Sequence, residues 1–256
     1  MRDHGSRFEV LRMKPHDHIG WTFSGPGDFS ALAEQFLQEG ASLNERLMYV
    51  AEDPDTTGFG GWTRELYPGT LMASSTAEVY GKSGMIDTAT QRATFAAVLR
   101  DALSEGYSGI RVAADNTRLV IDPERLESWI RWEVVADHFM AEHQVTGLCA
   151  FDRDQVDVST LTNLASLHAL SQAGSPAPNF RLFTNDGILW VTGELSPGAL
   201  EQAALALQAL PPKTDVVVDL TGTEGLSSEL LAAVGRLRRE GVAVTLLGST
   251  EAFEKP

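Results

Sequence analysis

The chain has 256 residues, 43% of them hydrophobic and 21% charged, which is the composition of a folded protein with one large domain or two ordinary ones. Twenty Lys and Arg against thirty-five Asp and Glu give a net charge of −15, and such a field repels nucleic-acid phosphates and anionic lipid headgroups. Cys149 is the single cysteine, which excludes an internal disulfide. Because the chain has neither a signal peptide nor a run of about eighteen apolar residues, we expect a cytoplasmic protein without nucleic-acid or membrane partners.

From His18 onward, short apolar runs alternate with longer amphipathic stretches, as in strands and helices around a parallel sheet. The predicted strands are His18–Phe23, Arg46–Glu52, Gly109–Asp115 and Val145–Asp152. The predicted helices are Asp28–Glu39, Asp87–Glu105 and Pro123–Glu142. Asp87 and Asp122 are expected to cap the second and third helices, and Trp129 and Trp132 are expected in the core.

Two segments interrupt this alternation. Residues 56–73 are rich in glycine and proline around Trp62 and Tyr67, which predicts a long surface excursion. Its aromatic rings either close over a pocket or pack the loop against the rest of the domain, and packing is the simpler interpretation. Ser171–Asn179 is short, rich in Ser, Ala, Gly and Pro, and is read as a linker between units 1–174 and 175–256.

The second unit is predicted to open with an antiparallel hairpin and to continue as alternating strands and helices. Its predicted strands are Phe180–Thr184, Ile188–Glu194, Asp215–Leu220 and Val242–Leu247, and its predicted helices are Pro197–Leu210 and Ser227–Arg239. The hairpin signal is Asn185-Asp186-Gly187 between two apolar runs.

The loop Ser24-Gly25-Pro26-Gly27-Asp28-Phe29-Ser30 follows the first strand, where a phosphate-binding loop would stand. Such a loop needs a lysine that reaches the terminal phosphates, and this one has none. Asp28 is expected to cap the following helix and to occupy the site itself. Hydrolysis of nucleoside triphosphates is therefore not expected. The alternative is a nucleotide-binding switch or weak NTPase that uses Glu52, Asp53 and Asp115, unless these are merely solvated acids at strand ends.

The segment SGPGDFSALAEQFLQEGASLNERLMYVAEDP resembles the first βαβ unit of the RecA/KaiC-type ATPases. Residues 17–172 also resemble the MEDS domain, a sensory domain of methanogens and of the dichloromethane-metabolism repressor of methylotrophs. The residues that carry this second resemblance are His18-Ile19, Gly40, Asn44-Glu45, Glu133, Gly147-Leu148-Cys149-Ala150-Phe151-Asp152 and His168. The two resemblances imply a RecA-like parallel sheet, flanked by helices and without a working phosphate loop, that senses a small organic ligand.

In open α/β sheets, ligands bind beyond the carboxyl ends of the strands. The predicted ligand-binding residues are accordingly His18, Phe23, Ser24, Asp53, Asp115 and Asp152. His16 and His18 lie on one side of an extended segment and together offer two metal ligands, but capping and core packing are more typical of such a pair, so neither a metal nor a cofactor is assigned. Cys149 lies in an apolar strand and is expected to be a buried small hydrophobe.

Residues 180–249 resemble a STAS domain, the fold of the anti-sigma factor antagonists, in the text TDVVVDLTGTEGLSSELLAAVGRLRREGVAVTLLG. The resemblance implies a second, smaller α/β domain in which Ser228, or its neighbour Ser227, is phosphorylated by a partner kinase. The alternative is that either serine is an ordinary helix cap. Because the chain ends soon after Val242–Leu247, we expect the first unit to cover part of the second sheet.

Together these patterns predict a non-catalytic signalling regulator. The implied partners are a small organic ligand and an anti-sigma factor or serine kinase. A homodimer is a further alternative that the sequence does not decide. Two other hypotheses remain: the nucleotide-binding protein described above, and a purely structural interaction protein.

Overall fold

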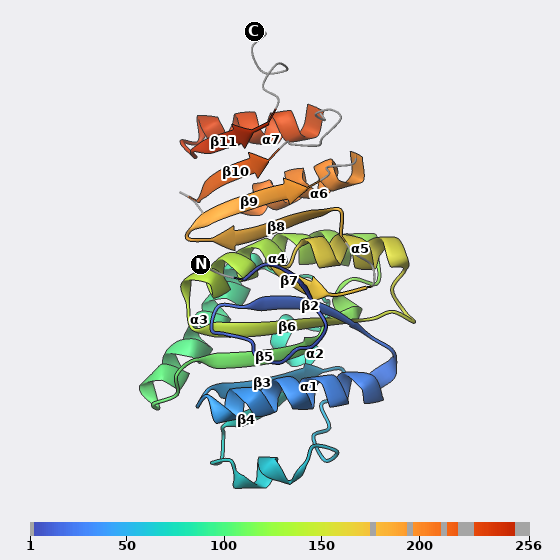
Figure 1. The fold of residues 1–256 in the computed structure, drawn as a ribbon, viewed down its shortest axis with the longest axis vertical. Helices are drawn as coiled ribbons and strands as arrows, with labels where there is room; N and C mark the ends of the chain where they lie inside the picture. The colour runs from blue at the N-terminus through green and yellow to red at the C-terminus, as the bar shows by residue number, and fades with distance from the viewer. Residues whose placement is uncertain (1–2, 175–177, 194–196, 211–213, 220–227, 249–256) are drawn as a thin grey trace.

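The computed structural model describes residues 3–174, 178–193, 197–210, 214–219 and 228–248, which form two β-sheets with helices around them (Figure 1). The strands are β1 (Gly5–Arg7), β2 (His18–Phe23), β3 (Arg46–Ala51), β4 (Leu71–Ser75), β5 (Ile110–Asp115), β6 (Val145–Asp152), β7 (Leu170–Gln172), β8 (Phe180–Asn185), β9 (Ile188–Gly193), β10 (Asp215–Asp219) and β11 (Val244–Leu247). The α-helices are α1 (Gly25–Ser42), α2 (Thr76–Tyr80), α3 (Thr88–Ser104), α4 (Pro123–Glu142), α5 (Val158–Ser166), α6 (Pro197–Ala209) and α7 (Ser228–Arg239), and short 3₁₀ turns span Gly61–Glu65 and Thr117–Leu119. The predicted α/β class is confirmed.

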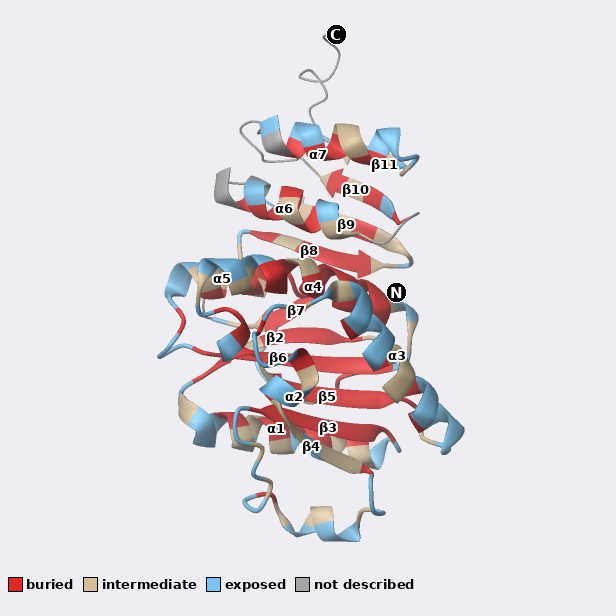
Figure 2. Ribbon diagram, turned by 180° about the vertical axis from the view of Figure 1, so that it is seen from behind, coloured by how far each residue is buried: buried red, intermediate tan, exposed pale blue. Residues whose placement is uncertain are grey.

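The larger sheet, as described, has seven strands in the order β1-β7-β2-β6-β5-β3-β4, and every neighbouring pair is parallel. The predicted bounds of β2 and β6 are confirmed, and His18 pairs with Gly147 at one end while Phe23 pairs with Asp152 at the other. The central strands are buried along their length (Figure 2). Helices cover both faces of this sheet, which explains why β3 and β6 read as continuous apolar runs.

Neighbouring residues on the central strands point into different cores. Ala113 and Leu148 pack with α1 on one face, whereas Val112 and Cys149 pack with α3 and α4 on the other. This alternation follows from the period of two in a strand. Trp129 and Trp132 of α4 are buried in the second of these cores, as expected.

Helix α1 begins earlier than the sequence indicated. Its N-cap position is Ser24, and Gly25 and Pro26 already belong to its first turn. Proline is tolerated there because the first N–H groups of a helix have no intrahelical partner. The expectation that Asp28 caps the helix is therefore wrong: Asp28 is an exposed residue of the first turn. By contrast, Asp87 and Asp122 accept hydrogen bonds from Thr90 N and Arg125 N, which confirms both as caps.

The excursion at residues 56–73 is partly ordered structure. It contains the turn Gly61–Glu65, and its end enters β4, which pairs with β3. Trp62 Nε1 donates a hydrogen bond to Glu34 Oε1 of α1 at 3.1 Å, which pins the excursion to the body, whereas Tyr67 is 84% exposed. The predicted linker is also shorter than expected, because β7 extends to Gln172 and pairs with β1 and β2.

The second sheet, within the described residues, has four strands in the order β11-β10-β9-β8. Its opening hairpin is antiparallel as predicted, and Asp186 and Gly187 take the positive φ angles of 52° and 76° that a tight two-residue turn needs. The remaining pairs are parallel.

Helix α4 lies between the two sheets (Figure 1) and contacts β6 on one side and β8 and α6 on the other. Val134 of α4 belongs to the core of the second unit, and Thr184 N of β8 donates a hydrogen bond to Asp137 Oδ2 of α4 at 2.6 Å. The expectation that the first unit covers part of the second sheet is thus confirmed. Among the described helices, none is both long enough and apolar enough to cross a membrane.

Candidate functional site

A cleft of about 830 Å³ opens at the carboxyl ends of the central strands. Its lining includes four of the six residues predicted to bind a ligand: Phe23, Asp53, Asp115 and Asp152. Ser24 lies beside this strand-end cleft and its hydroxyl donates a hydrogen bond to Asp154. His18 does not join them, because it begins β2 and so lies at the opposite end of that strand.

The floor of the strand-end cleft is aromatic. Phe23, Phe29, Tyr49 and Phe59 are all buried, and their ring centroids follow one another at 5.2, 5.5 and 5.1 Å. The Tyr49 hydroxyl lies 3.1 Å from Ser30 Oγ, and burial raises the pKa of Tyr49. Phe59 belongs to the excursion at residues 56–73. That segment is therefore bound to α1 through Trp62 and also forms one wall of the cleft.

The rim of the cleft is acidic, and two of its carboxylates are tied to neighbouring backbone. Asp115 Oδ1 accepts from Thr117 N at 3.0 Å and from Thr117 Oγ1 at 2.6 Å, while burial raises the pKa of Asp115. Burial opposes ionisation of Asp152 as well, but hydrogen bonds from Gln155, Asp154 N and Gly25 N hold its pKa below the usual value.

The charge of the cleft is one-sided. The acidic residues that line it are Glu34, Glu52, Asp53, Asp55, Asp115 and Asp152, and no Lys or Arg lines it among the described residues. Glu52 pairs with Arg118 at 2.8 Å, outside the lining. Such a surface attracts cations and repels phosphates.

A second group of polar side chains lies inside the molecule, between the large sheet and α4. We call His18, Glu133, Cys149 and His168 the buried cluster; the two imidazoles, the carboxylate and the thiol offer ligand atoms within 4.8 Å of one another. Glu133 Oε1 lies 3.0 Å from His18 Nε2 and 2.7 Å from His168 Nε2, and His18 Nε2 lies 3.4 Å from Cys149 Sγ. The side chains of Glu133 and both histidines are fully buried.

The other ring nitrogen of each histidine has its own partner. His18 Nδ1 lies 3.1 Å from Asp137 Oδ1, and His168 Nδ1 lies 2.8 Å from the carbonyl oxygen of Leu164. These contacts orient both rings so that Nε2 faces Glu133.

The charges of the buried cluster shift one another's protonation. Burial works to lower the pKa of both histidines, but the Glu133 carboxylate outweighs it and raises the pKa of His168 to about 9 and that of His18 well above its usual value. In turn the two histidines, against the effect of burial, lower the pKa of Glu133 to about 2. In the protonated state the cluster is therefore a carboxylate held by imidazolium groups.

Two glycines allow this close approach. A Cβ atom at Gly20 would lie 2.7 Å from His168 Nδ1, and one at Gly147 would lie 2.8 Å from Met140 Cε and 3.3 Å from His18 Cδ2. Any larger residue at either position would displace a neighbouring side chain.

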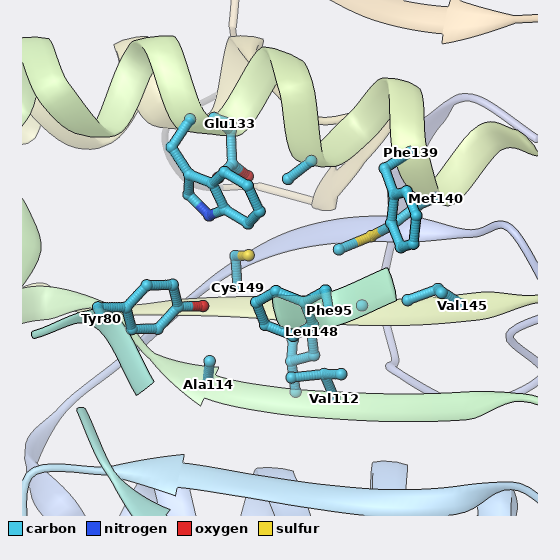
Figure 3. A pocket seen from close by; sticks show the side chains of 13 residues that line it. Tyr80, Phe95, Val112, Ala114, Glu133, Phe139, Met140, Val145, Leu148 and Cys149 are labelled. Carbon is cyan, nitrogen blue, oxygen red and sulfur yellow. The ribbon is translucent and has the colours of Figure 1, made fainter. Parts of the chain in front are cut away.

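A cavity of about 20 Å³ adjoins the buried cluster and is shown in Figure 3. Glu133 points into it from α4, Cys149 from β6, and the Tyr80 ring lies on the opposite side. The remaining walls are apolar, including Phe95 and Phe139. A space of this size holds about one water-sized group.

The MEDS family model, described as the MEthanogen/methylotroph, DcmR Sensory domain, matches residues 17–169, more than half of the chain. The chain belongs to the MEDS family. No curated protein and no solved structure matches it. The MEDS domain contains both the buried cluster and the strand-end cleft, and its description as a sensory domain indicates a sensing or signalling role.

Sequence reasoning named all four members of the buried cluster but did not place them together. His18 was expected at the strand-end cleft, Cys149 as an isolated hydrophobe, and Glu133 and His168 only as residues that carry the MEDS resemblance. The expected burial of Cys149 is confirmed. His16, for which capping or packing was the preferred expectation, lies outside the cluster, and its Nδ1 lies 3.0 Å from the carbonyl oxygen of Met140. The available signal was that the MEDS resemblance includes all four residues.

Two other residues that carry the MEDS resemblance, Gly40 and Glu45, contact Arg111 on the face of the sheet that α1 covers. Arg111 donates from Nε to Glu45 Oε2 at 2.5 Å and from Nη1 to Glu39 Oε2 at 2.8 Å. A Cβ at Gly40 would lie 2.6 Å from Arg111 Cδ, so this position accepts only glycine without movement. The main-chain carbonyls of Phe36 and Met13 accept the remaining guanidinium hydrogen bonds, which indicates a structural role.

Of the two serines predicted to be phosphorylated, Ser228 is the first residue of α7 and is exposed. Ser227 lies outside the described residues.

Proposed function

We propose that this protein is a non-catalytic signalling regulator whose MEDS domain binds a small organic cation in the strand-end cleft. The observation that carries the proposal is the pairing of an aromatic floor with an acidic rim. The rim carboxylates attract the charge of an alkylammonium group, and the floor, whose aromatic rings are almost fully buried, gives its methyl groups an apolar base. A cleft of about 830 Å³ is also of the size that small-molecule sites have.

The same cleft is poorly suited to a nucleotide. Only Ser24 separates β2 from α1, so no loop remains that could wrap a phosphate. The backbone N–H of Gly25, at the start of α1, is one of the groups that lower the pKa of Asp152, so this carboxylate already faces the helix N-terminus. A RecA-type ancestry for the large sheet is compatible with this strand–helix arrangement. In our proposal the sheet still binds a ligand at the carboxyl ends of its strands but no longer binds phosphate.

Calorimetry on the whole chain tests this proposal, with tetramethylammonium, Mg-ATP and Mg-GTP as separate ligands and sodium as the ionic control. We expect saturable binding of tetramethylammonium, and no binding of either nucleotide. Asp53→Asn should weaken the binding about tenfold, roughly 1.4 kcal/mol, because it removes one rim charge. Asp101→Asn, an exposed carboxylate outside the cleft, is the matched control.

Micromolar binding of a nucleotide would overturn the proposal in favour of a nucleotide switch. Equal heats for tetramethylammonium and sodium would mean that the cleft attracts counter-ions without recognising an organic group.

For the C-terminal unit we propose a STAS-like protein–protein switch that responds to the MEDS domain, with an anti-sigma factor or a serine kinase as the partner. Its support is the exposed position of Ser228 at the start of α7, where backbone N–H groups and the helix dipole stabilise a phosphate. Mass spectrometry after incubation with serine kinases of this type should find phosphate on Ser228 or Ser227. If neither serine is modified, the unit acts as an adaptor without a phosphorylation switch.

A further inference from the structure

The buried cluster has the ligand set of a metal centre. It offers two imidazole nitrogens, one carboxylate oxygen and one thiol sulfur, all within 4.8 Å of one another. Tetrahedral zinc, with metal–ligand bonds of about 2.0–2.3 Å, places neighbouring ligand atoms roughly 3.3–3.8 Å apart. The contacts of Glu133 Oε1 with the two histidines are 3.0 and 2.7 Å, and that of His18 Nε2 with Cys149 Sγ is 3.4 Å. To admit an ion, these three contacts need to lengthen by less than about 1 Å, and any pair as far apart as the 4.8 Å limit needs to shorten by roughly 1–1.5 Å.

Hydrogen bonding inside the buried cluster is incomplete. Both carboxylate oxygens of Glu133 and Nε2 of His168 are buried and, among the described residues, make no hydrogen bond of acceptable geometry, despite the short distances between them. Glu133 thus has two histidines beside it but no well-aligned hydrogen-bond donor, which is costly for a fully buried carboxylate. A cation between the four side chains satisfies Glu133 and His168 at once.

The surroundings of the cluster match those of histidine ligands to metals. In such sites one ring nitrogen binds the ion while the other contacts a carboxylate or a main-chain carbonyl. His18 has Asp137 in that position and His168 has the carbonyl of Leu164. Both Nε2 atoms are thereby directed to one point, beside Glu133 and Cys149.

We propose that His18 Nε2, Glu133 Oε1, Cys149 Sγ and His168 Nε2 bind one divalent transition-metal ion, with zinc preferred. Mixed nitrogen, oxygen and sulfur ligands in fourfold coordination suit zinc, whereas magnesium and calcium require six or more oxygen ligands. On binding, the thiol proton and any proton on either Nε2 leave to solvent, so the ion meets a thiolate and two neutral imidazoles.

This metal site is separate from the strand-end cleft. No member of the buried cluster lines that cleft, so binding of an organic cation there and binding of metal here fail or succeed independently. The metal site has its own route to the second unit, because Asp137 contacts His18 through Oδ1 and accepts from Thr184 N of β8 through Oδ2. Loss of the ion would therefore change the position of Asp137 and, through its hydrogen bond with Thr184 N, the packing of β8.

Cobalt and zinc titrations of the tag-free whole chain test the proposal after treatment with a chelator and a reductant. One equivalent of Co²⁺ should give the visible bands of a tetrahedral site and a near-ultraviolet thiolate-to-cobalt band, and one equivalent of Zn²⁺ should abolish both. Cys149→Ser should remove the near-ultraviolet band and weaken binding at least tenfold. His168→Gln should weaken binding by a similar factor. His143→Gln, a half-buried histidine outside the cluster, should titrate like the unmodified chain.

The proposal is overturned if the unmodified chain gives no tetrahedral cobalt spectrum at one equivalent, a readout that needs no variant to fold. It is equally overturned if Cys149→Ser keeps the near-ultraviolet band, or if folded His168→Gln binds metal as tightly as His143→Gln. In those cases the cluster is a buried carboxylate paired with protonated histidines and binds no metal ion.

Discussion

Arg111 is a fully buried arginine whose charge is met by two carboxylates. Burial raises the pKa of Glu45, and the neighbouring guanidinium and Thr146 hydroxyl oppose that rise. Glu45 depends most on this arrangement, because it is buried and loses its counter-charge if Arg111 is removed, whereas Glu39 is partly exposed to solvent.

Arg111→Met should lower the free energy of unfolding by about 3–5 kcal/mol, since it leaves Glu45 buried without its counter-charge. Urea denaturation measures this loss. The double variant Arg111→Met with Glu45→Gln should recover more than half of it. A loss below about 1 kcal/mol in the single variant would show that Glu45 is solvated or protonated in the folded chain.

At the same scale, the local rule for helix caps is right for Asp87 and Asp122 and wrong for Asp28, because α1 begins at Gly25. Asp87 and Asp122 were recognisable as caps because the rule involves residues three apart. His18 and Cys149 are 131 positions apart, and only the pairing of β2 with β6 brings them together. No local sequence pattern predicts a contact between residues so far apart in the chain.

At the scale of elements, the long apolar strands and amphipathic helices were predicted because each carries its own periodicity. The eight-residue strand β6 and the twenty-residue helix α4 have the predicted bounds. Strand β4, in contrast, reads LMASS and has no apolar alternation, so its extended form depends on pairing with β3. Strands β1 and β7, at one side of the larger sheet, have three residues each, too few for a periodic signal.

Helix α5, which the sequence reading missed, provides an element-scale prediction. Its N-cap Asp157 accepts hydrogen bonds from Ser159 Oγ, Thr160 N and Thr160 Oγ1, and these hold its pKa at about 2. Asp157→Ala should destabilise the chain by about 0.5–2 kcal/mol at pH 7. We place the effect in the lower half of that range, because the carboxylate is exposed to solvent.

The sign of the pH dependence follows from the lowered pKa of Asp157. The ionised carboxylate contributes its full stabilisation above the ordinary value of 3.8, and that contribution is lost as the pH falls toward about 2. The stability difference between the unmodified chain and Asp157→Ala should therefore stay constant above about pH 4 and shrink between about pH 4 and pH 2 in urea melts. Asp157→Asn keeps a capping side chain without the charge, so its difference from Ala should not change with pH. A constant difference for the unmodified chain would contradict the assignment.

At the scale of the whole molecule, α4 connects the strand-end cleft to the second unit. Asp115 of the cleft is tied to Thr117 of the short turn that precedes α4, and Arg118 of the same turn pairs with Glu52. Arg125, in the first turn of α4, donates to the carbonyl oxygen of Arg118 at 3.1 Å. Farther along α4, Asp137 accepts from Thr184 N of β8. These contacts form a contiguous connection from the rim of the cleft to β8, and we expect a change at the rim to alter β8.

Hydrogen exchange of the whole chain, with and without saturating tetramethylammonium, shows whether ligand binding in the MEDS domain reaches the C-terminal unit. We expect slower exchange around the strand-end cleft together with a change in β8 and α6. At the same ligand concentration, both changes should be smaller in Asp53→Asn, in proportion to its lower occupancy. The same exchange in β8 and α6 with and without the ligand, alongside protection at the cleft, would contradict the claim that the MEDS domain signals to the C-terminal unit.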